Sequence, residues 1–387
     1  MKLALISHGN AENPRHFSGS AWHALQEMRR QGHAVEAFYA EPTDWAKKLA
    51  HLKNLWSLKF SRQPHHPEAD GWILRTRSRR IDQKIRAFGP DAVVCLGFPE
   101  TALALSRDWP LYVWTDALFP TERRHYAYFR DYYSDDDAQV LQYLEERVLQ
   151  RTQKVWLTSE WAAAESRTDF PRSAGLFAMQ SFGANLANPP APAEIEQAII
   201  GRNLYTPTLL FLANEWERKG GDTAVETVRS LRAKGCFARL AIVGLKTKPA
   251  SVPNEPWIEW VGPLDKRKPE EARRLQAYFL ESAFLILPTI ADCTPIVCHE
   301  ASAYGLPVLA TDVGGLPSTV SNGESGQLWP PAKFAGEAPE WIFSIVAERP
   351  RYEIFARASR QRFEKLGNWT VNVRAVMAAI SEDLVKP

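Results

Sequence analysis

Residues 291–315 read ADCTPIVCHEASAYGLPVLATDVGG, and the rest of the chain can be organised around them. The order of residue types predicts a loop, a short helix, a short strand and a glycine-rich loop. Pro295 stands near the expected helix start, where a missing N–H costs nothing. Gly305 stands just past the expected end, where a left-handed residue is favoured. Residues 308–310 form an apolar strand that ends at Gly314-Gly315, as expected of an α/β protein.

Two carboxylates in this stretch, Asp292 and Glu300, are separated by seven residues. Asp292 precedes the expected helix, and Glu300 lies about one turn into it. The free N–H groups at a helix start attract anions. The pair therefore indicates a ligand site, and the simpler interpretation is a helix cap with an exposed glutamate.

The same stretch resembles the signature of retaining, nucleotide-sugar-dependent glycosyltransferases of family 4, which have the GT-B fold. The matching motifs are Glu300-Ala301, Gly305-Leu306-Pro307-Val308 and Gly314-Gly315. The chain is a variant in which the first acidic residue of the motif is Asp292 instead of the usual glutamate. The resemblance implies an α/β chain with two Rossmann-like domains facing a central cleft. It also implies a C-terminal helix that crosses back to the first domain.

Composition is that of a globular protein with no strong charge bias. The chain has 387 residues, 45% of them hydrophobic and 24% charged, with a formal net charge of +2. This length predicts two domains, and this charge gives no global signal for nucleic acid. Four cysteines without a CxxC pair argue against zinc and against a disulfide framework. No apolar run has the length of a signal or membrane-spanning segment, so we expect a cytoplasmic protein, with the inner face of the membrane as an option.

Strand-like and helix-like segments alternate in both halves of the chain, which is typical of parallel α/β domains. Between the halves, NLANPPAPAEIEQ is rich in Pro and Ala without periodicity, and it predicts an interdomain linker. We expect an N-terminal acceptor domain over 1–187, a linker over 188–207 and a C-terminal nucleotide-sugar donor domain over 208–368. The terminal helix, 369–387, is expected to join the first domain.

Two residues of the first half are candidates for ligand contact. Gly19 leads into the first helix, where a glycine lets a backbone approach a ligand closely; it also fits an ordinary turn. Asp116 ends the apolar strand 110–116, and the carboxyl edge of an open α/β sheet carries its ligands. The resemblance places Asp116 near the reacting sugar or the acceptor hydroxyl. The alternative is a cap of the following helix.

The segment 44–86 is rich in basic and aromatic residues and poor in acidic ones. The simplest interpretation is a solvated helix face and a loop. The composition also suits peripheral contact with an anionic bilayer or binding of an acidic acceptor. Single-stranded nucleic acid is a third option that no other part of the chain supports, and we predict no nucleic-acid partner. The residues concerned are Trp45, Lys47, Lys48, Lys53, Trp56, Lys59, Phe60, Arg62, Arg75, Arg77, Arg79 and Arg80.

A second candidate site follows the apolar strand that opens the second half. Glu-Arg-Lys-Gly-Gly (217–221) lies between this strand and a helix. Two cations at a helix start oppose its positive dipole end, and a bound anion would reconcile them. Lys219-Gly220 matches the family's diphosphate-binding motif, and Arg218 is a second candidate because guanidinium binds phosphate in bidentate fashion. The alternative is a solvated Arg-Lys pair.

The resemblance implies a role for each residue of the donor site. Arg218 and Lys219 would stabilise the diphosphate as negative charge grows on it, without a metal or other cofactor. Asp292 would hold hydroxyls of the donor sugar, and Glu300 would accept hydrogen bonds from the ribose. The helix start would contact the diphosphate through Thr294, Pro295, Ile296 and Val297, and Gly262 and Leu264 would border the base.

The predicted function is that of a retaining, metal-independent glycosyltransferase. It would move a sugar from a UDP- or GDP-sugar to a hydroxyl of a glycan, a lipid-linked molecule or a small molecule. One alternative is a catalytically inactive GT-B protein that binds nucleotide sugars. The other is a GT-B nucleotide-sugar epimerase.

Overall fold

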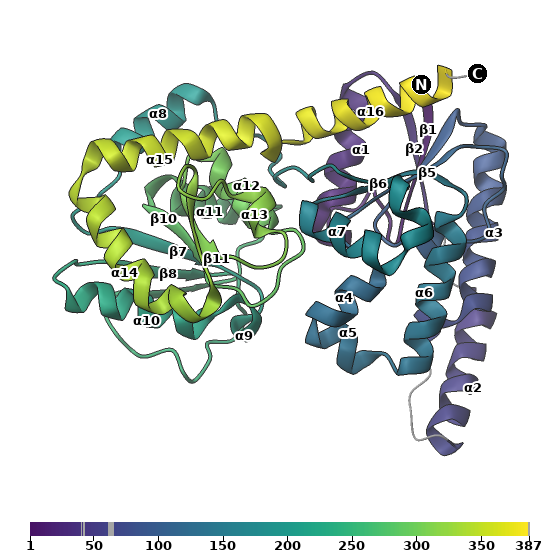
Figure 1. The fold of residues 1–387 in the computed structure, drawn as a ribbon, viewed down its shortest axis with the longest axis horizontal. Coiled ribbons are helices and arrows are strands. Elements are labelled where there is room, and N and C mark those ends of the chain that lie inside the picture. The colour runs from purple at the N-terminus through teal and green to yellow at the C-terminus, as the bar shows by residue number, and fades with distance from the viewer. Residues whose placement is uncertain (40, 42, 61–65, 386–387) are drawn as a thin grey trace. The chain divides into compact units, whose positions relative to one another are not determined.

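The computed structural model describes residues 1–39, 41, 43–60 and 66–385, and it consists of two compact units. Unit 1 comprises Met1–Asn185 and Trp369–Pro387, and unit 2 comprises Leu186–Asn368. Each unit contains one six-stranded parallel sheet packed among helices (Figure 1). The α/β class with two Rossmann-like domains, predicted from the sequence, is confirmed.

Unit 1 has the strand order β2-β1-β3-β4-β5-β6. Its strands are β1 (Lys2–Ser7), β2 (Ala34–Phe38), β3 (Ala92–Leu96), β4 (Leu111–Thr115), β5 (Thr152–Leu157) and β6 (Phe177–Met179). Its α-helices are α1 (Ser20–Arg30), α2 (Asp44–Phe60), α3 (Gly71–Phe88), α4 (Phe119–His125), α5 (Ala127–Tyr132), α6 (Asp135–Leu149), α7 (Glu160–Asp169) and α16 (Trp369–Val385). Short 3-10 turns are η1 (His16–Gly19), η2 (Pro67–Ala69), η3 (Pro99–Ala102) and η4 (Pro171–Leu176).

Unit 2 has the strand order β12-β11-β10-β7-β8-β9. Its strands are β7 (Thr208–Leu212), β8 (Arg239–Val243), β9 (Ile258–Gly262), β10 (Phe284–Leu287), β11 (Val308–Thr311) and β12 (Gly326–Trp329). Its helices are α8 (Pro192–Gly201), α9 (Trp216–Lys219), α10 (Gly221–Ala233), α11 (Pro269–Glu281), α12 (Ile296–Ala303), α13 (Leu316–Thr319), α14 (Pro331–Ala347), α15 (Arg349–Arg362) and the π-helical turn η5 (Phe363–Gly367).

The central strands are continuous apolar runs, because helices pack on both faces of a parallel sheet. Every residue of β3 (AVVCL), β4 (LYVWT), β10 (FLIL) and β11 (VLAT) is buried. Parallel strands also end at one shared edge, and the loops that leave this edge carry the predicted site residues of each unit.

The C-terminal helix α16 belongs to unit 1, as the resemblance implied. Its first residue, Trp369, donates its indole N–H to Asn185 Oδ1 (3.1 Å) and stacks on Phe182, with ring centroids 5.5 Å apart. Gly183 makes this contact possible, because a Cβ there would overlap the Trp369 backbone nitrogen and ring. Arg30 of α1 also donates to Thr370 Oγ1 (2.8 Å). The helix is therefore an integral part of the unit 1 core.

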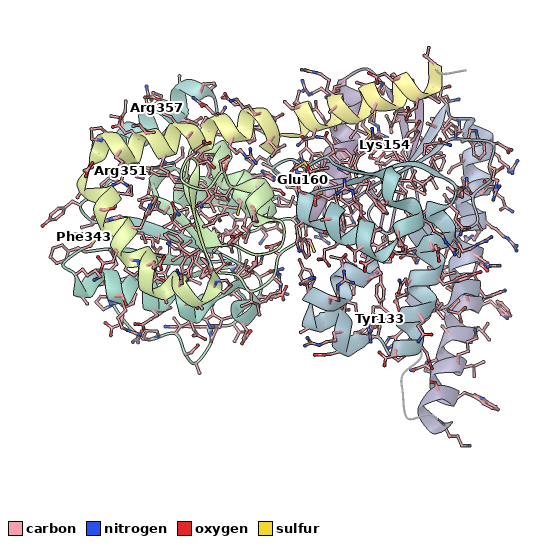
Figure 2. All side chains as sticks on the ribbon, viewed as in Figure 1. Tyr133, Lys154, Glu160, Phe343, Arg351 and Arg357 are labelled. Atoms are coloured by element: carbon pink, nitrogen blue, oxygen red, sulfur yellow. The ribbon has the colours of Figure 1, made fainter. Side chains whose placement is uncertain are left out.

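The predicted linker 188–207 is wrong in one respect, because most of it forms helix α8 and packs into unit 2. Pro192 stands at the first turn, where its missing N–H is harmless. Ile195 and Ile199 are buried, and α8 contacts α11 and α15. Arg357 of α15, labelled in Figure 2, donates to Glu196 at 2.6 and 3.1 Å. The Pro-Ala composition concealed the i, i+4 spacing of the two isoleucines.

Arg202, at the end of α8, fixes this segment further. The side chain is 2% exposed and donates to the carbonyl oxygens of Gly305 (2.6 Å) and Tyr304 (2.7 Å) and to the Tyr352 hydroxyl (3.0 Å). These carbonyls lie at the C-terminal end of α12, where orphan acceptors need donors. Arg202 thereby ties the predicted linker to the helix that carries Glu300.

Candidate functional site

Three loops interlock at the carboxyl edge of the unit 2 sheet, after β7, β10 and β11. Gly220 has φ +75°, and a Cβ there would overlap the Pro288 carbonyl oxygen. Gly314 has φ +54°, and a Cβ there would overlap the Asp292 carbonyl oxygen. The same oxygen accepts the Gly315 amide at 2.8 Å. The Lys-Gly and Gly-Gly motifs therefore hold the loop of Asp292 from two sides.

Lys219 and Asp292 form an ion pair at this junction, with the Lys219 ammonium donating to Asp292 Oδ2. Their side chains are only 11% and 7% exposed. The interpretation of Lys219 as a solvated cation is therefore wrong. The structure brings together two residues that the sequence analysis placed in one site, although 73 positions separate them.

Arg218 points to the same loop through a different set of contacts. Its guanidinium makes a bidentate pair with Glu215 (2.8 and 2.9 Å) and donates to the Ala291 carbonyl (2.9 Å). The hydrogen bond from Arg218 is the main cause that lowers the pKa of Glu215. The Arg218 backbone carbonyl also accepts the Ile290 amide (2.9 Å) and the Thr289 hydroxyl (2.8 Å). Arg218 thus ties the β7 loop to the β10 loop, and its predicted contact with a phosphate remains a prediction.

Glu300 lies on α12 and is 3% exposed, so the interpretation as an exposed glutamate is wrong. Its Oε1 accepts a hydrogen bond from Lys266, in the loop that follows β9. The sequence analysis missed Lys266. The signal was the charged run Asp265-Lys266-Arg267-Lys268, which comes directly after a strand of the sheet. Each acidic residue of the motif is therefore paired with a lysine from another strand end.

The start of α12 offers fewer amides than the sequence suggested. Pro295 is the N-cap, and its carbonyl accepts the Cys298 amide (2.8 Å), while the Thr294 carbonyl accepts the Ile296 amide (2.8 Å). Val297 is within the first turn, so its amide has no carbonyl four residues back within the helix. Thr294, Ile296 and Val297 are half-buried. Of the predicted donor-binding amides, Val297 is the one best suited to an anion.

Burial keeps another polar residue of α12 neutral. His299 follows Cys298 and is 1% exposed, and burial is the main cause that lowers the pKa of His299 to about 3. A Cβ at Gly367 would lie 3.0 Å from His299 Nδ1, so η5 covers this ring closely. His299 is therefore part of the packing beneath the motif helix.

The predicted base-binding residues lie at the end of β9. Gly262 has φ +79°, and its carbonyl accepts the Gly244 amide at 2.9 Å. The pairing of β8 and β9 shifts register just before this point. Leu264 is half-buried two residues further on, in the loop that leads to Lys266. Gly262, Leu264 and Lys266 thus share one loop at the sheet edge.

In unit 1, Asp116 follows β4 and is half-buried. Its Oδ1 accepts the Ala117 amide (3.2 Å), and its carbonyl accepts the Thr158 hydroxyl (3.3 Å). Asp116 does not cap the next helix. The buried Glu145 carboxylate does so, accepting the Phe119 amide at 3.0 and 3.1 Å. The structure leaves the predicted acceptor role of Asp116 as a prediction.

Glu145 is one of three buried glutamates near Asp116 that the sequence analysis missed. Glu100, Glu122 and Glu145 are 8%, 8% and 2% exposed. Burial raises the pKa of Glu100 to about 7 and is the main cause that raises the pKa of Glu122 and of Glu145 well above the usual range. The Asp116 charge adds to the rise in the pKa of Glu122. For Glu145 the signal was its place on the apolar face of α6, beside Leu141, Leu144 and Val148.

Gly19 stands at the end of η1 with φ +87°, and it is the N-cap of α1. A loop and η1 separate it from β1, so Gly19 does not follow the strand directly. Asn185 donates its side-chain amide to the Ser18 carbonyl (2.8 Å), and both Phe17 and Ser18 have positive φ angles. Such strain is held only by surrounding contacts and is common in functional loops. Contact of Gly19 with a ligand remains a prediction.

The structure also bears on metals and membranes. In the part of the chain that it describes, no group of three or more His, Cys, Asp or Glu side chains is placed to hold a metal ion. Across the same residues, no helix is long and apolar enough to cross a bilayer.

The arrangement of both sheets agrees with that of known structures. The fold is the GT-B fold: sucrose-phosphate synthase from Thermosynechococcus elongatus aligns over 99% of both chains with a TM-score of 0.68 and 18% identity. HepE of Anabaena, solved in complex with UDP, aligns over 99% of this chain and 100% of its own, with a TM-score of 0.64 and 14% identity.

The match to a protein family lies within unit 2. Residues 206–344, which lie within unit 2, match the family described as glycosyl transferases group 1. The amylovoran biosynthesis glycosyltransferase AmsK of Erwinia amylovora is 30% identical over 135 residues, 32% of each chain. The D-inositol 3-phosphate glycosyltransferase of Corynebacterium glutamicum is 30% identical over 139 residues, 33% of this chain and 32% of its own. The chain thus matches about a third of the length of these curated relatives, and the predicted family resemblance is confirmed.

Proposed function

We propose that this protein is a retaining glycosyltransferase that transfers a sugar from a nucleoside-diphosphate sugar to an acceptor hydroxyl without a metal ion. The observation that carries the proposal is the buried Lys219–Asp292 pair, held at the carboxyl edge of the unit 2 sheet by two glycine motifs. The group 1 family of this unit supports the same reaction class.

The pair suits the chemistry of a leaving diphosphate. Negative charge grows on that group as the glycosidic bond breaks, and a cation already fixed and desolvated stabilises it more than a solvated one does. Lys219 would supply this cation, with Arg218 beside it. Asp292 would orient the sugar through its hydroxyl groups, and its ion pair holds the carboxylate in place before the donor arrives.

The Glu300–Lys266 pair suits the nucleoside part of the donor. A buried, ionised carboxylate is a strong acceptor for ribose hydroxyls. Lys266 holds Glu300 in one orientation, and its loop also carries Gly262 and Leu264, the candidates for contact with the base. We infer a UDP- or GDP-sugar, and the UDP complex of HepE makes UDP-sugars the first donors to test.

Retention of the anomeric configuration follows if the acceptor attacks from the face that the diphosphate leaves. The leaving phosphate then takes the proton of the acceptor hydroxyl, so no separate base is needed. Asp116 would orient the acceptor. The acceptor class is open among glycans, lipid-linked molecules and small molecules, because the relatives named above differ in what their names say they act on.

The four cysteines support a reducing compartment for this reaction. Cys95, Cys236, Cys293 and Cys298 are buried thiols, and none takes part in a disulfide. Disulfides form in oxidising compartments and are rare in the cytosol. We therefore place the enzyme in the cytoplasm.

A protein that binds nucleotide sugars without transferring them is a second candidate. It is favoured by the engagement of both motif carboxylates with lysines, which a donor must share or displace. Turnover separates the two. Release of nucleoside diphosphate from one donor, dependent on an acceptor, supports the transferase, and stabilising binding without release supports the binding protein. Interconversion of two donor sugars would instead indicate an epimerase.

A further inference from the structure

Helix α2 turns its large apolar side chains outward. Trp45, Leu52, Leu55 and Trp56 are 61%, 55%, 50% and 68% exposed. Their spacing of three, four and seven residues places them in one stripe along the helix. In Figure 1, α2 lies at the rim of unit 1, and one end projects past the neighbouring helices. The face is exposed, as the simplest interpretation of this segment expects, but it carries large apolar side chains where a solvated helix face is usually polar.

The side of α2 that packs against unit 1 carries none of these four side chains. It carries the buried alanines Ala46 and Ala50. These alanines border a pocket of about 710 Å³ that is also lined by His66 and Tyr132. The helix therefore turns small apolar residues toward the unit, and bulky apolar residues with lysines among them toward solvent. Trp45 meets the Trp72 ring of α3 edge-on, with ring centroids 5.1 Å apart, yet all four large apolar side chains of α2 stay at least half exposed. Unit 1 therefore buries only a small part of their apolar surface.

The charge of this region identifies the partner. Residues 44–86 contain eleven lysines and arginines against four acidic residues, a surplus of seven, whereas the whole chain is only +2. Lys48 and Lys59 lie within the apolar stripe and are exposed, and Arg75 and Arg79 of α3 are exposed as well. Arg62 lies outside the described residues. The rest of the chain is net negative, so the positive charge is concentrated where the apolar side chains face outward.

We propose that α2 docks unit 1 on the surface of an anionic lipid bilayer, lying in the plane of the membrane. Trp45 and Trp56 would sit at the level of the headgroups, where amphipathic rings are favoured. Leu52 and Leu55 would enter the acyl boundary, and Lys48 and Lys59 would contact anionic headgroups. α2 has 17 residues and carries four lysines, so it lies on the membrane and does not cross it.

Lipid fits this face better than the other occupants. Single-stranded nucleic acid gains from stacking on aromatic rings but not from leucines between them. In a dimer formed through this face, the lysines of one copy would lie against the lysines of the other, and like charges repel at such an interface. The inference does not depend on the proposed transfer reaction, because it concerns binding alone.

Flotation with vesicles tests the proposal without an activity assay. The full-length protein is mixed with vesicles of phosphatidylcholine containing 30 mol% phosphatidylglycerol, or with vesicles of phosphatidylcholine alone, and the floated fraction is measured. Three variants are compared with wild type: Trp56→Ala, Lys48→Glu/Lys59→Glu, and Leu52→Ser/Leu55→Ser. Two controls remove an exposed ring or lysine from unit 2: Tyr205→Ala (77% exposed) and Lys333→Glu.

Wild type is expected to float with the anionic vesicles and not with the neutral ones. Reversing the two lysines should lower the partition coefficient at least about 30-fold, since each cation contributes about fivefold near an anionic surface. Trp56→Ala should lower it about tenfold. All variants should keep the wild-type far-UV circular dichroism, because these side chains are exposed.

Four results would overturn the proposal. The first is no flotation of the wild type. The second is equal binding to neutral vesicles. The third is an equal loss in Tyr205→Ala or Lys333→Glu. The fourth is a wild-type dimer in solution that the α2 variants convert to monomer, which would make this face an interface between copies of the chain.

Discussion

Replacement of Lys219 by methionine tests the buried Lys219–Asp292 ion pair of unit 2. Methionine keeps the length and apolar stem of lysine but removes the charge. The pair is almost fully buried, so Lys219→Met leaves the Asp292 carboxylate without its cation. Breaking a buried pair in this way costs about 3–5 kcal/mol, a large part of the stability of a single domain.

The companion variant separates this structural cost from catalysis. In Lys219→Met/Asp292→Asn both charges are gone, and most of the lost stability should return, to within about 1–2 kcal/mol of wild type. Lys234→Met serves as the matched control, because the Lys234–Glu340 pair is exposed and contributes at most about 1 kcal/mol. Urea unfolding followed by circular dichroism gives the three values.

Catalysis is measured in the same proteins as release of nucleoside diphosphate from the donor. Loss of one fixed donor to a developing anion lowers kcat about 10²–10³-fold, so Lys219→Met should lose that much while Lys234→Met loses nothing. Lys219→Arg keeps the charge and should recover part of the rate. A folded Lys219→Met protein that still binds nucleotide and keeps its kcat would refute the role given to Lys219. An unchanged unfolding free energy would refute the buried pair.

Three further predictions concern the site and its support. Glu300→Gln should weaken nucleotide binding about tenfold in titration calorimetry, since a charged hydrogen-bond acceptor becomes a neutral one; unchanged affinity would remove Glu300 from the ribose site. Gly220→Ala should lower the unfolding free energy by more than about 2 kcal/mol, because its Cβ would overlap the Pro288 carbonyl. The control is Gly235→Ala, which also has a positive φ but lies in open space, and it should cost only about 1 kcal/mol. Equal costs would show that the loops do not interlock. Because the pKa of Glu100 is raised from 4.5 to about 7, the folded state holds its proton more tightly, so this stabilisation is complete below about pH 4.5 and is lost as pH rises to 7. Glu100→Gln should therefore flatten the fall in stability over pH 4.5–7 by up to about 1.4 kcal/mol per pH unit, and a slope equal to that of wild type would contradict the assignment.

Most strands of both sheets could be predicted because parallel strands buried on two faces leave a plain apolar pattern. β3, β4, β7 and β10 are runs of this kind. Residues that share one stretch of sequence could also be predicted to share one site, as with Asp292, Gly314 and Gly315. In these cases local sequence and tertiary structure favour the same conformation.

The helix α8 and the partners of the motif carboxylates could not be predicted, because they depend on contacts between distant segments. α8 has a Pro- and Ala-rich composition, and only its packing against α11 and α15 makes it part of unit 2. Lys266 reaches Glu300 across 34 positions. Which face of α2 points toward solvent could not be predicted either. Helical spacing shows which side chains share a face, but it does not show which face meets the core.

The most direct test of the central claim is release of nucleoside diphosphate by the purified protein. UDP- and GDP-sugars would be offered one at a time, with glycan, lipid-linked and small-molecule acceptors, in buffer containing EDTA. We predict that one donor is turned over with at least one acceptor, that EDTA leaves the rate unchanged, and that the product keeps the anomeric configuration of the donor. A protein that releases no diphosphate from any donor, and that no nucleotide stabilises against heat, would contradict the account.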